Sequence, residues 1–281
     1  MGYGVQIFGC LKEFRQDSAG FFRRLGQMGY RQVEPCILFG GGEGISPELR
    51  ERLWKPAEVP GFLRMMEDCG LTLSSCHVFD SDPLAYADGL LRLAEEVPVS
   101  AYVVNCDGGT IAAGYPAFAE VCTRLSKLLS PRGVELWIHN LGTEIRERVV
   151  ENGRELTVLE ALLARCPEQV GVQVDTGWAL YGGVDPAEYL RRVAPRLRSV
   201  HFKDMAAGFE RLSGDDIFAV LGGGVTDCGE VFSAVPQGRG VTVLVDQDMS
   251  RGDFFADLEQ SLQVLNRFGA AWEAGEKEGL K

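Results

Sequence analysis

The chain contains three histidines, and each stands at the end of an apolar run that is typical of a β-strand. They are His77, His139 and His201, and they follow one another at even intervals. Lys203 and Asp204 come directly after the third histidine. Functional groups gathered at one strand end are more typical of a binding or catalytic site than of a core. Imidazole nitrogens can bind a metal or carry a proton near neutral pH.

Carboxylates follow other apolar runs in the same way. Asp175 ends the run 170–174, and Asp246 and Asp248 follow the run 241–245. Burying a carboxylate alone is costly, so a charge partner is expected for Asp175. With His139 and His201, Asp175 and Asp246 form a mixed nitrogen and oxygen set that suits one divalent metal ion, such as Mn, Zn, Co or Mg. Such an ion would bind two adjacent substrate oxygens and polarise a carbonyl group.

Eight apolar strand-like runs alternate with amphipathic, helix-like segments, and no linker interrupts them. The expected strands cover 4–8, 32–36, 71–75, 101–105, 134–138, 170–174, 197–202 and 241–245. The expected helices cover 19–28, 60–69, 84–96, 116–129, 157–165, 186–193, 229–235 and 254–268. This alternation predicts an α/β fold, a single (β/α)8 TIM barrel over residues 1–269, followed by a polar, frayed tail over 270–281. In such a barrel the strand ends converge on one active site.

Composition excludes several classes of protein. The net charge of −12 repels a phosphate backbone and an anionic membrane, so we expect neither nucleic acid nor membrane as a partner. The N-terminus shows no signal peptide, and eight cysteines without one predict reduced thiols in a cytoplasmic protein. A structural zinc ribbon is not expected because no C-x-x-C pair occurs. The sequence leaves a homo-oligomer open.

Three segments stand in the order and spacing of known motifs: Val172-Gln-Val-Asp-Thr-Gly-Trp178, Gly182-Gly-Val-Asp-Pro186 and Val200-His-Phe-Lys-Asp204. They resemble the D-T-G-H, G-x-D-P and V-H-x-K-D motifs of the xylose-isomerase-like family of sugar isomerases, epimerases and dehydratases. Gly222–Asp227 resembles the G-x-G-x-I-D turn of that family, and Val245–Asp248 its V-E-Q-D strand end. The resemblance covers nearly the whole chain.

The resemblance implies a TIM-barrel enzyme that binds one divalent metal ion and acts on a sugar, keto-sugar or keto-inositol. The reaction would pass through an enediolate, formed when a base removes the proton next to the carbonyl. Isomerase, epimerase and dehydratase share this intermediate. They differ in where the proton returns or which hydroxyl leaves.

The chain departs from the family pattern at three positions. His139 stands where many epimerases carry a Glu that binds metal and moves a proton, and Asp246 shortens another Glu. Trp178 replaces a His that multi-metal DNA-repair relatives use as a ligand. These changes argue against a two-glutamate epimerase and, with the acidic charge, against an apurinic endonuclease. The stretch His139–Glu144 is similar to the Y-H-N-H-x-x-E motif of one branch and to the H-H-M-G-T motif of inosose dehydratases.

The expected roles follow from the resemblance and the strand ends together. The metal ligands would be His139, Asp175, His201 and Asp246, with Glu144 as the alternative to His139. The proton carriers would be His139, Glu144 and Asp246, and the substrate contacts Glu34, His77, Lys203 and Trp178.

Simpler roles remain open for several of these residues. His201 could be a hydrogen-bonded core residue, Glu144 a helix-start acid and Glu34 a bridge between neighbouring strands. Lys203 could face either a substrate oxygen or the Asp204 carboxylate. The glycine-rich stretch Gly40–Gly44 lacks the residues of a phosphate loop, and we interpret it as a mobile lid. The two functional alternatives are a metal-dependent lyase or hydrolase acting on a sugar derivative, and a non-catalytic sugar-binding protein whose metal site has decayed.

Overall fold

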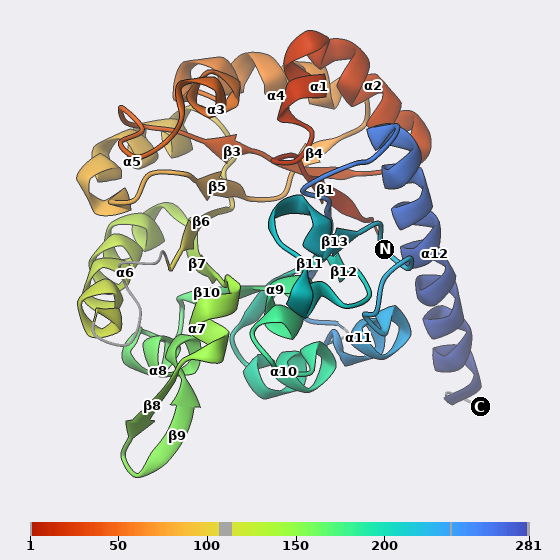
Figure 1. Ribbon diagram of the computed structural model, residues 1–281. Helices are drawn as coiled ribbons and strands as arrows, with labels where there is room; N and C mark the ends of the chain where they lie inside the picture. Colours follow the sequence, from red (N-terminus) through yellow and green to blue (C-terminus); the bar gives the residue numbers. More distant parts are fainter. Residues whose placement is uncertain (1, 107–113, 237, 280–281) are drawn as a thin grey trace.

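The structure is a computed structural model that describes residues 2–106, 114–236 and 238–279. Ten short strands form one parallel sheet that closes on itself (Figure 1). The strands are β1 (Gly4–Gln6), β2 (Gln32–Glu34), β3 (Cys36–Ile37), β4 (Thr72–Leu73), β5 (Cys76–Val78), β6 (Ala101–Asn105), β7 (Glu135–His139), β10 (Gly171–Asp175), β11 (Leu197–Phe202) and β14 (Thr242–Asp246).

Two of the eight barrel strands are interrupted. Pro35, which has no N–H to donate, separates β2 from β3, and Ser74 and Ser75 separate β4 from β5. The first halves of the two interrupted strands, β2 and β4, pair with each other, and so do the second halves, β3 and β5. With β1 between β2 and β14, the ring closes in sequence order. The predicted eight-unit barrel is therefore confirmed.

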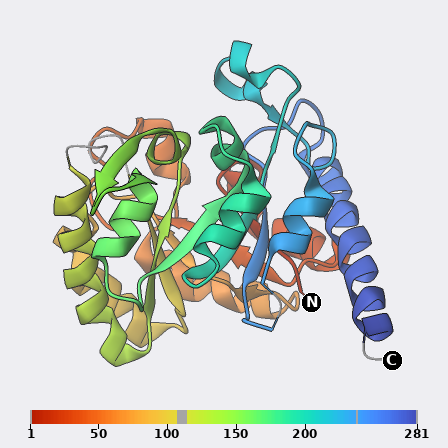
Figure 2. The same ribbon diagram turned by 90° about the horizontal axis from the view of Figure 1, so that it is seen from below.

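Helices follow the strands, and most of them surround the barrel on its outside (Figures 1 and 2). They are α1 (Leu11–Gln16), α2 (Ser18–Met28), α3 (Pro47–Arg52), α4 (Val59–Glu67), α5 (Ala87–Glu96), α6 (Tyr115–Leu129), α7 (Gly142–Arg146), α8 (Val158–Arg165), α9 (Thr176–Tyr181), α10 (Pro186–Val193), α11 (Cys228–Ala234) and α12 (Phe254–Gly279). The expected helices lie where the apolar periodicity placed them. The sequence did not predict α1, α3, α7 and α9, which are too short for a periodic pattern. Helix α12 continues to Gly279, beyond the expected end at residue 268. Within the described residues, no helix combines the length and apolar character that crossing a bilayer requires.

The apolar core lies mainly between the strands and the helices, whereas the barrel interior carries polar side chains. Glu34, Gln173, Ser199 and His201 come from three strands, β2, β10 and β11, and are all fully buried. Buried polar groups are stable only when they bond to one another or to a ligand. The interior is therefore a polar network, and its members position the candidate site.

Two excursions leave the barrel. A hairpin of β8 (Arg148–Glu151) and β9 (Arg154–Thr157) projects after α7, and its turn places Asn152 and Gly153 at positive φ (Figure 1). The long loop, residues 204–227, contains the short antiparallel pair β12 (Asp204–Met205) and β13 (Phe218–Ala219), and it stands above the end of β11 (Figure 2).

One carboxylate closes the long loop at its base. The Oδ1 atom of Asp204 accepts hydrogen bonds from the backbone N–H groups of Met205 and Thr226, each at 2.9 Å. Its Oδ2 atom accepts from the N–H groups of Gly222 and Gly224, at 3.0 and 2.9 Å. A Cβ atom at Gly224 would come within 2.4 Å of Asp204, so this position needs glycine. The Asp of the V-H-x-K-D motif is thus a structural residue that joins the two ends of the loop.

Replacing Asp204 with Asn should therefore destabilise the long loop. The amide offers one acceptor oxygen in place of two and directs N–H donors at backbone N–H groups, so we expect the free energy of unfolding to fall by about 2–4 kcal/mol. Chemical denaturation measures this change, and limited proteolysis should cut within the loop. Asp215→Asn, on the exposed part of the same loop, is the matched control. Equal stability of the two variants would contradict the role of Asp204.

Candidate metal and substrate site

Parallel pairing brings the strand-end residues together at one end of the barrel. Asp175 on β10 stands beside His201 on β11 in the register of that pair, and Asn105 on β6 stands beside His139 on β7. Across the ring, Gln6 lies between Glu34 and Asp246. The convergence expected from the barrel is therefore present, and it gathers side chains from strands far apart in sequence.

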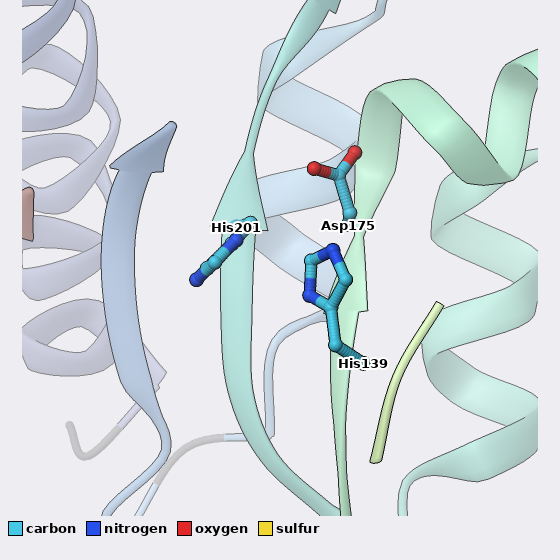
Figure 3. A group of neighbouring side chains, drawn as sticks. All are labelled: His139, Asp175 and His201. Carbon is cyan, nitrogen blue, oxygen red and sulfur yellow. The ribbon is translucent and has the colours of Figure 1, made fainter. Parts of the chain in front are cut away.

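Three of the four expected metal ligands form a compact group. His139, Asp175 and His201 each offer a ligand atom, and these atoms all lie within 4.8 Å of one another. All three side chains are buried. Figure 3 shows the His139 ring directed toward the Asp175 carboxylate, with His201 alongside on the neighbouring strand. Two imidazoles and a carboxylate are a donor set that suits a divalent transition metal.

His201 lies between two carboxylates. Its Nδ1 is 3.1 Å from Asp246 Oδ2, and its Nε2 is 3.0 Å from Glu34 Oε1. Burial alone would lower the pKa of His201, but the charge of Glu34 and the contact with Asp246 raise it to about 10. Burial likewise raises the pKa of Glu34, yet His201 holds that pKa well below its usual range. The imidazole and the two carboxylates therefore stabilise one another's charged forms.

Lys203 lies among three carboxylates. Its Nζ is 2.5 Å from Asp248 Oδ2, 3.0 Å from Asp246 Oδ2 and 3.3 Å from Asp175 Oδ2. Burial would lower the pKa of Lys203, but these carboxylates raise it well above its usual value. Burial raises the pKa of Asp175 to about 7, against the opposing charge of Lys203. Asp204, the alternative partner considered from the sequence, bonds instead to the backbone of the long loop.

The D-T-G motif builds the surroundings of this lysine. The Thr176 hydroxyl donates to the Lys203 carbonyl at 2.8 Å and accepts from the Lys203 N–H at 3.0 Å, which ties β11 to the start of α9. A Cβ at Gly177 would lie 2.8 Å from the Lys203 Cγ, so glycine leaves room for the lysine stem. Asp175 Oδ1 accepts from the Trp178 N–H at 2.8 Å and so begins α9. Its Oδ2 faces Lys203.

Trp178 is partly buried near the lysine. Its ring centroid is 5.7 Å from Lys203 Nζ, and the ring meets Phe218 of β13 edge-on at 5.5 Å. Met205, Phe209, Ile217 and Phe218 form a small apolar cluster that packs against this tryptophan. Trp178, which the sequence predicts to contact the substrate, therefore forms the aromatic side of the candidate site and joins α9 to the long loop.

The remaining predicted residues occupy different places. His77 on β5 has Nε2 2.8 Å from Asn105 Oδ1 and Nδ1 3.5 Å from Glu34 Oε1. Glu34 is fully buried, so it faces protein side chains more than open space. Glu144 lies on α7, one per cent exposed, and it is outside the three-residue ligand group. In the glycine-rich stretch, the Gly40 N–H donates to Asp80 Oδ1 at 2.8 Å, so the start of the proposed lid is anchored.

Sequence reasoning missed Gln173, Ser75 and Ser199. Gln173 Nε2 donates to Glu34 Oε2 at 2.7 Å and to Ser199 Oγ at 3.2 Å, while its Oε1 lies 2.9 Å from His139 Nδ1. Ser75 donates a short hydrogen bond to the same Glu34 oxygen. For Gln173 the sequence offered one signal, a polar residue between Val172 and Val174 in an otherwise apolar strand.

The donor set fits a divalent cation. Among the described residues, Asp246 Oδ1 accepts no hydrogen bond, and Glu34 Oε1 and Asp175 Oδ2 contact His201 and Lys203 outside hydrogen-bond geometry. The surrounding acids, which include Asp248, outnumber the two cationic groups, His201 and Lys203. A buried oxygen without a donor and an excess of negative charge are features that a bound cation would satisfy.

Lys203→Met tests the charge balance of the site. Removing the ammonium leaves three carboxylates close together and partly unpaired, so we expect the free energy of unfolding to fall by about 3–5 kcal/mol. Urea denaturation of the metal-free protein measures this loss, with Lys127→Met on the exposed face of α6 as the control. Stability equal to that of the control would show that the lysine does not hold these carboxylates.

Comparison with known proteins gives the context of this site. The model of the xylose isomerase-like TIM barrel family matches residues 22–268. The inosose dehydratase of Geobacillus kaustophilus (strain HTA426) is 34% identical over 213 residues, which cover 73% of this chain and 59% of that protein. An inosose dehydratase of Bacillus thuringiensis (strain Al Hakam) is 26% identical over 164 residues, 54% of this chain and 49% of the relative. The chain thus spans less than two thirds of the length of these curated relatives.

Solved structures share the fold. A sugar phosphate isomerase/epimerase from Parabacteroides distasonis ATCC 8503 aligns with a TM-score of 0.70 at 19% identity, covering 94% of this chain and 97% of that one. D-psicose 3-epimerase from Clostridium cellulolyticum H10, with D-tagatose, aligns with a TM-score of 0.66 at 13% identity, covering 96% and 99%. At these identities the likeness concerns the barrel alone. From the family match and the closed barrel together, the chain belongs to the xylose isomerase-like TIM barrel family.

Proposed function

We propose that this protein is a divalent-metal-dependent dehydratase acting on an uncharged keto-polyol such as a keto-inositol. The observation that carries the proposal is the buried group of His139, Asp175 and His201 at the carboxyl ends of their strands, with Asp246 against His201. These four residues would hold one ion of Mn, Zn, Co or Mg, and His201 would lose its proton to free a ring nitrogen for the ion. When bound, such an ion polarises a carbonyl group and stabilises negative charge that develops on its oxygen.

Two carboxyl groups are the proposed proton carriers. The Oδ2 atom of Asp246 is held by His201 and Lys203, while its Oδ1 accepts no hydrogen bond among the described residues, so Oδ1 is the proposed base. It would remove the proton from the carbon next to the carbonyl and leave an enediolate. Glu144, buried on α7 just beyond β7, is the proposed acid. It would protonate the leaving hydroxyl, so that one C–H and one C–O bond break and one water is released.

The histidine at position 139 favours dehydration over epimerisation. Epimerisation needs a second base that returns the proton to the opposite face of the carbon. At this position the chain has an imidazole in place of a carboxylate: the Nδ1 of His139 is engaged with Gln173, and its ring is directed toward Asp175 (Figure 3). The relatives named inosose dehydratases support the same choice. An isomerase or epimerase of keto-sugars is the second candidate.

The charge of the site favours an uncharged substrate. Within the residues that the structure describes, Lys203 is the basic side chain that pairs with the acids of the site. Three carboxylates already neutralise its positive charge. A phosphate or carboxylate on the substrate would meet an excess of negative charge. Trp178 and Phe218 offer an apolar surface that suits the C–H face of a polyol ring.

Asp175→Asn tests the metal assignment. The variant loses the charged oxygen that faces His139 and Lys203, so elemental analysis should find about one divalent ion per chain in the wild type and far less in the variant, as expected when a first ligand is lost. Asp68→Asn, an exposed position at the end of α4, is the control and should retain the ion. Retained metal in Asp175→Asn would contradict the ligand set.

A substrate panel followed by mass spectrometry tests the reaction. We expect a keto-inositol to lose one water, and phosphorylated ketoses to remain unchanged, because the site repels added negative charge. A product of unchanged mass and inverted configuration would favour the epimerase. Metal-dependent loss of a larger group would favour a lyase or hydrolase on a sugar derivative. Ligand-induced thermal stabilisation without metal or turnover would favour a sugar-binding protein.

A further inference from the structure

One buried carboxylate, Glu34, has no part in the proposed proton transfers, yet it is connected to all three histidines of the chain. Its Oε1 lies 3.0 Å from His201 Nε2 and 3.5 Å from His77 Nδ1. Its Oε2 accepts from Gln173, whose other amide atom meets His139. Glu34 is fully buried, and both of its oxygens face side chains of the barrel interior. Such a position suits a residue that orients ligands more than one that binds substrate.

We propose that Glu34 is a positioning residue that fixes the tautomer of His139 through the side-chain amide of Gln173, and so presents the bare Nε2 of His139 to a metal ion. The inference follows from which atoms can donate a hydrogen and which can only accept one. The assignment of that nitrogen to a metal rests on the proposed function, whereas the tautomer itself does not.

The first step concerns Glu34 and Gln173. An ionised carboxylate has no hydrogen to donate, so the Gln173 atom 2.7 Å from it must be the NH₂ group. If the amide were turned over, two acceptor oxygens would face each other at that distance. Ser199, the second partner of the same NH₂ group, can donate or accept and therefore does not decide the orientation.

The second step concerns Gln173 and His139. With the NH₂ group toward Glu34, the Gln173 oxygen faces His139 Nδ1 at 2.9 Å, and this oxygen can only accept. The hydrogen of the imidazole must then be on Nδ1. A neutral imidazole carries a single hydrogen, and in the neutral ring this hydrogen is on Nδ1. Nε2 is left with a free lone pair.

The third step concerns the direction of that lone pair. Figure 3 shows the outer part of the His139 ring directed toward the Asp175 carboxylate, within the group whose ligand atoms lie within 4.8 Å of one another. A metal-binding histidine whose other ring nitrogen donates to an oxygen has its tautomer and ring plane fixed. Here the oxygen that fixes the His139 ring belongs to the side-chain amide of Gln173. The negative charge that orients this amide is on Glu34.

Nuclear magnetic resonance of the ring nitrogens tests the inference in the metal-free protein. The chain contains three histidines, so two-bond ¹H–¹⁵N spectra carry few signals, and His139→Asn identifies those of His139. We expect wild-type His139 to be the Nδ1–H tautomer. In Glu34→Gln the new amide can donate to Gln173 and let it turn over, so the Nε2–H tautomer should appear.

Ser75→Ala is the matched control. It removes another donor to the same Glu34 oxygen but keeps the carboxylate, so His139 should remain the Nδ1–H tautomer. Gln173→Met is a second variant, which removes the amide between Glu34 and His139 while Glu34 stays in place. Both tautomers of His139 should then appear. Calorimetric titration with Zn²⁺ should show affinity about 10–100-fold weaker in Glu34→Gln, and unchanged affinity in Ser75→Ala.

The outcomes separate the inference from the proposed function. A wild-type His139 protonated on Nε2, or a Glu34→Gln variant that keeps the Nδ1–H tautomer, overturns the inference whether or not metal binds. A tautomer change with unaltered Zn²⁺ affinity overturns the link to the metal. If wild-type protein binds no Zn²⁺, Mn²⁺ or Co²⁺, the proposed metal site fails, and the spectra still decide the tautomer.

Discussion

The structure depends on how a barrel interior can hold several carboxylates away from water. An isolated buried carboxylate is unstable, and three buried acids of the candidate site, Glu34, Asp175 and Asp246, would disrupt the fold if left alone. His201 lies between Glu34 and Asp246, and Lys203 lies among Asp175, Asp246 and Asp248. The negative charge that remains is what makes the same cluster suitable for a cation. Folding and the proposed metal binding would thus share one set of side chains.

The sequence predicted the barrel because each strand is a short apolar run between helical periods, and barrel geometry then placed the strand ends together. His139, Asp175, His201 and Asp246 are neighbours for that reason. What the sequence could not predict is how side chains pair inside. Lys203 turns toward Asp175 at the end of β10 and toward Asp246 and Asp248 at and just after the end of β14, and away from its neighbour Asp204. This pairing depends on three-dimensional distances.

The short elements were also beyond prediction from sequence. Helix α9 begins on the carboxylate of Asp175 and has too few residues for a periodic pattern, yet it sets the positions of Trp178 and Thr176 around Lys203. Gln173 was hidden because a single polar residue in an apolar strand has no periodic meaning. Its importance appears only when Glu34 and His139 are seen on either side of it.

The attachment of the long loop to Asp204 has a consequence for how this barrel can diversify. Because four backbone N–H groups from both ends of the loop meet on one carboxylate, the 206–221 segment is a module closed at its base. Its ends stay together whatever its length, so added residues carry only the slow entropic cost of a longer loop. This segment supplies Phe218 to the aromatic side of the site. Evolution can therefore replace the segment beside the candidate site while the strand end that carries His201 and Lys203 keeps its place.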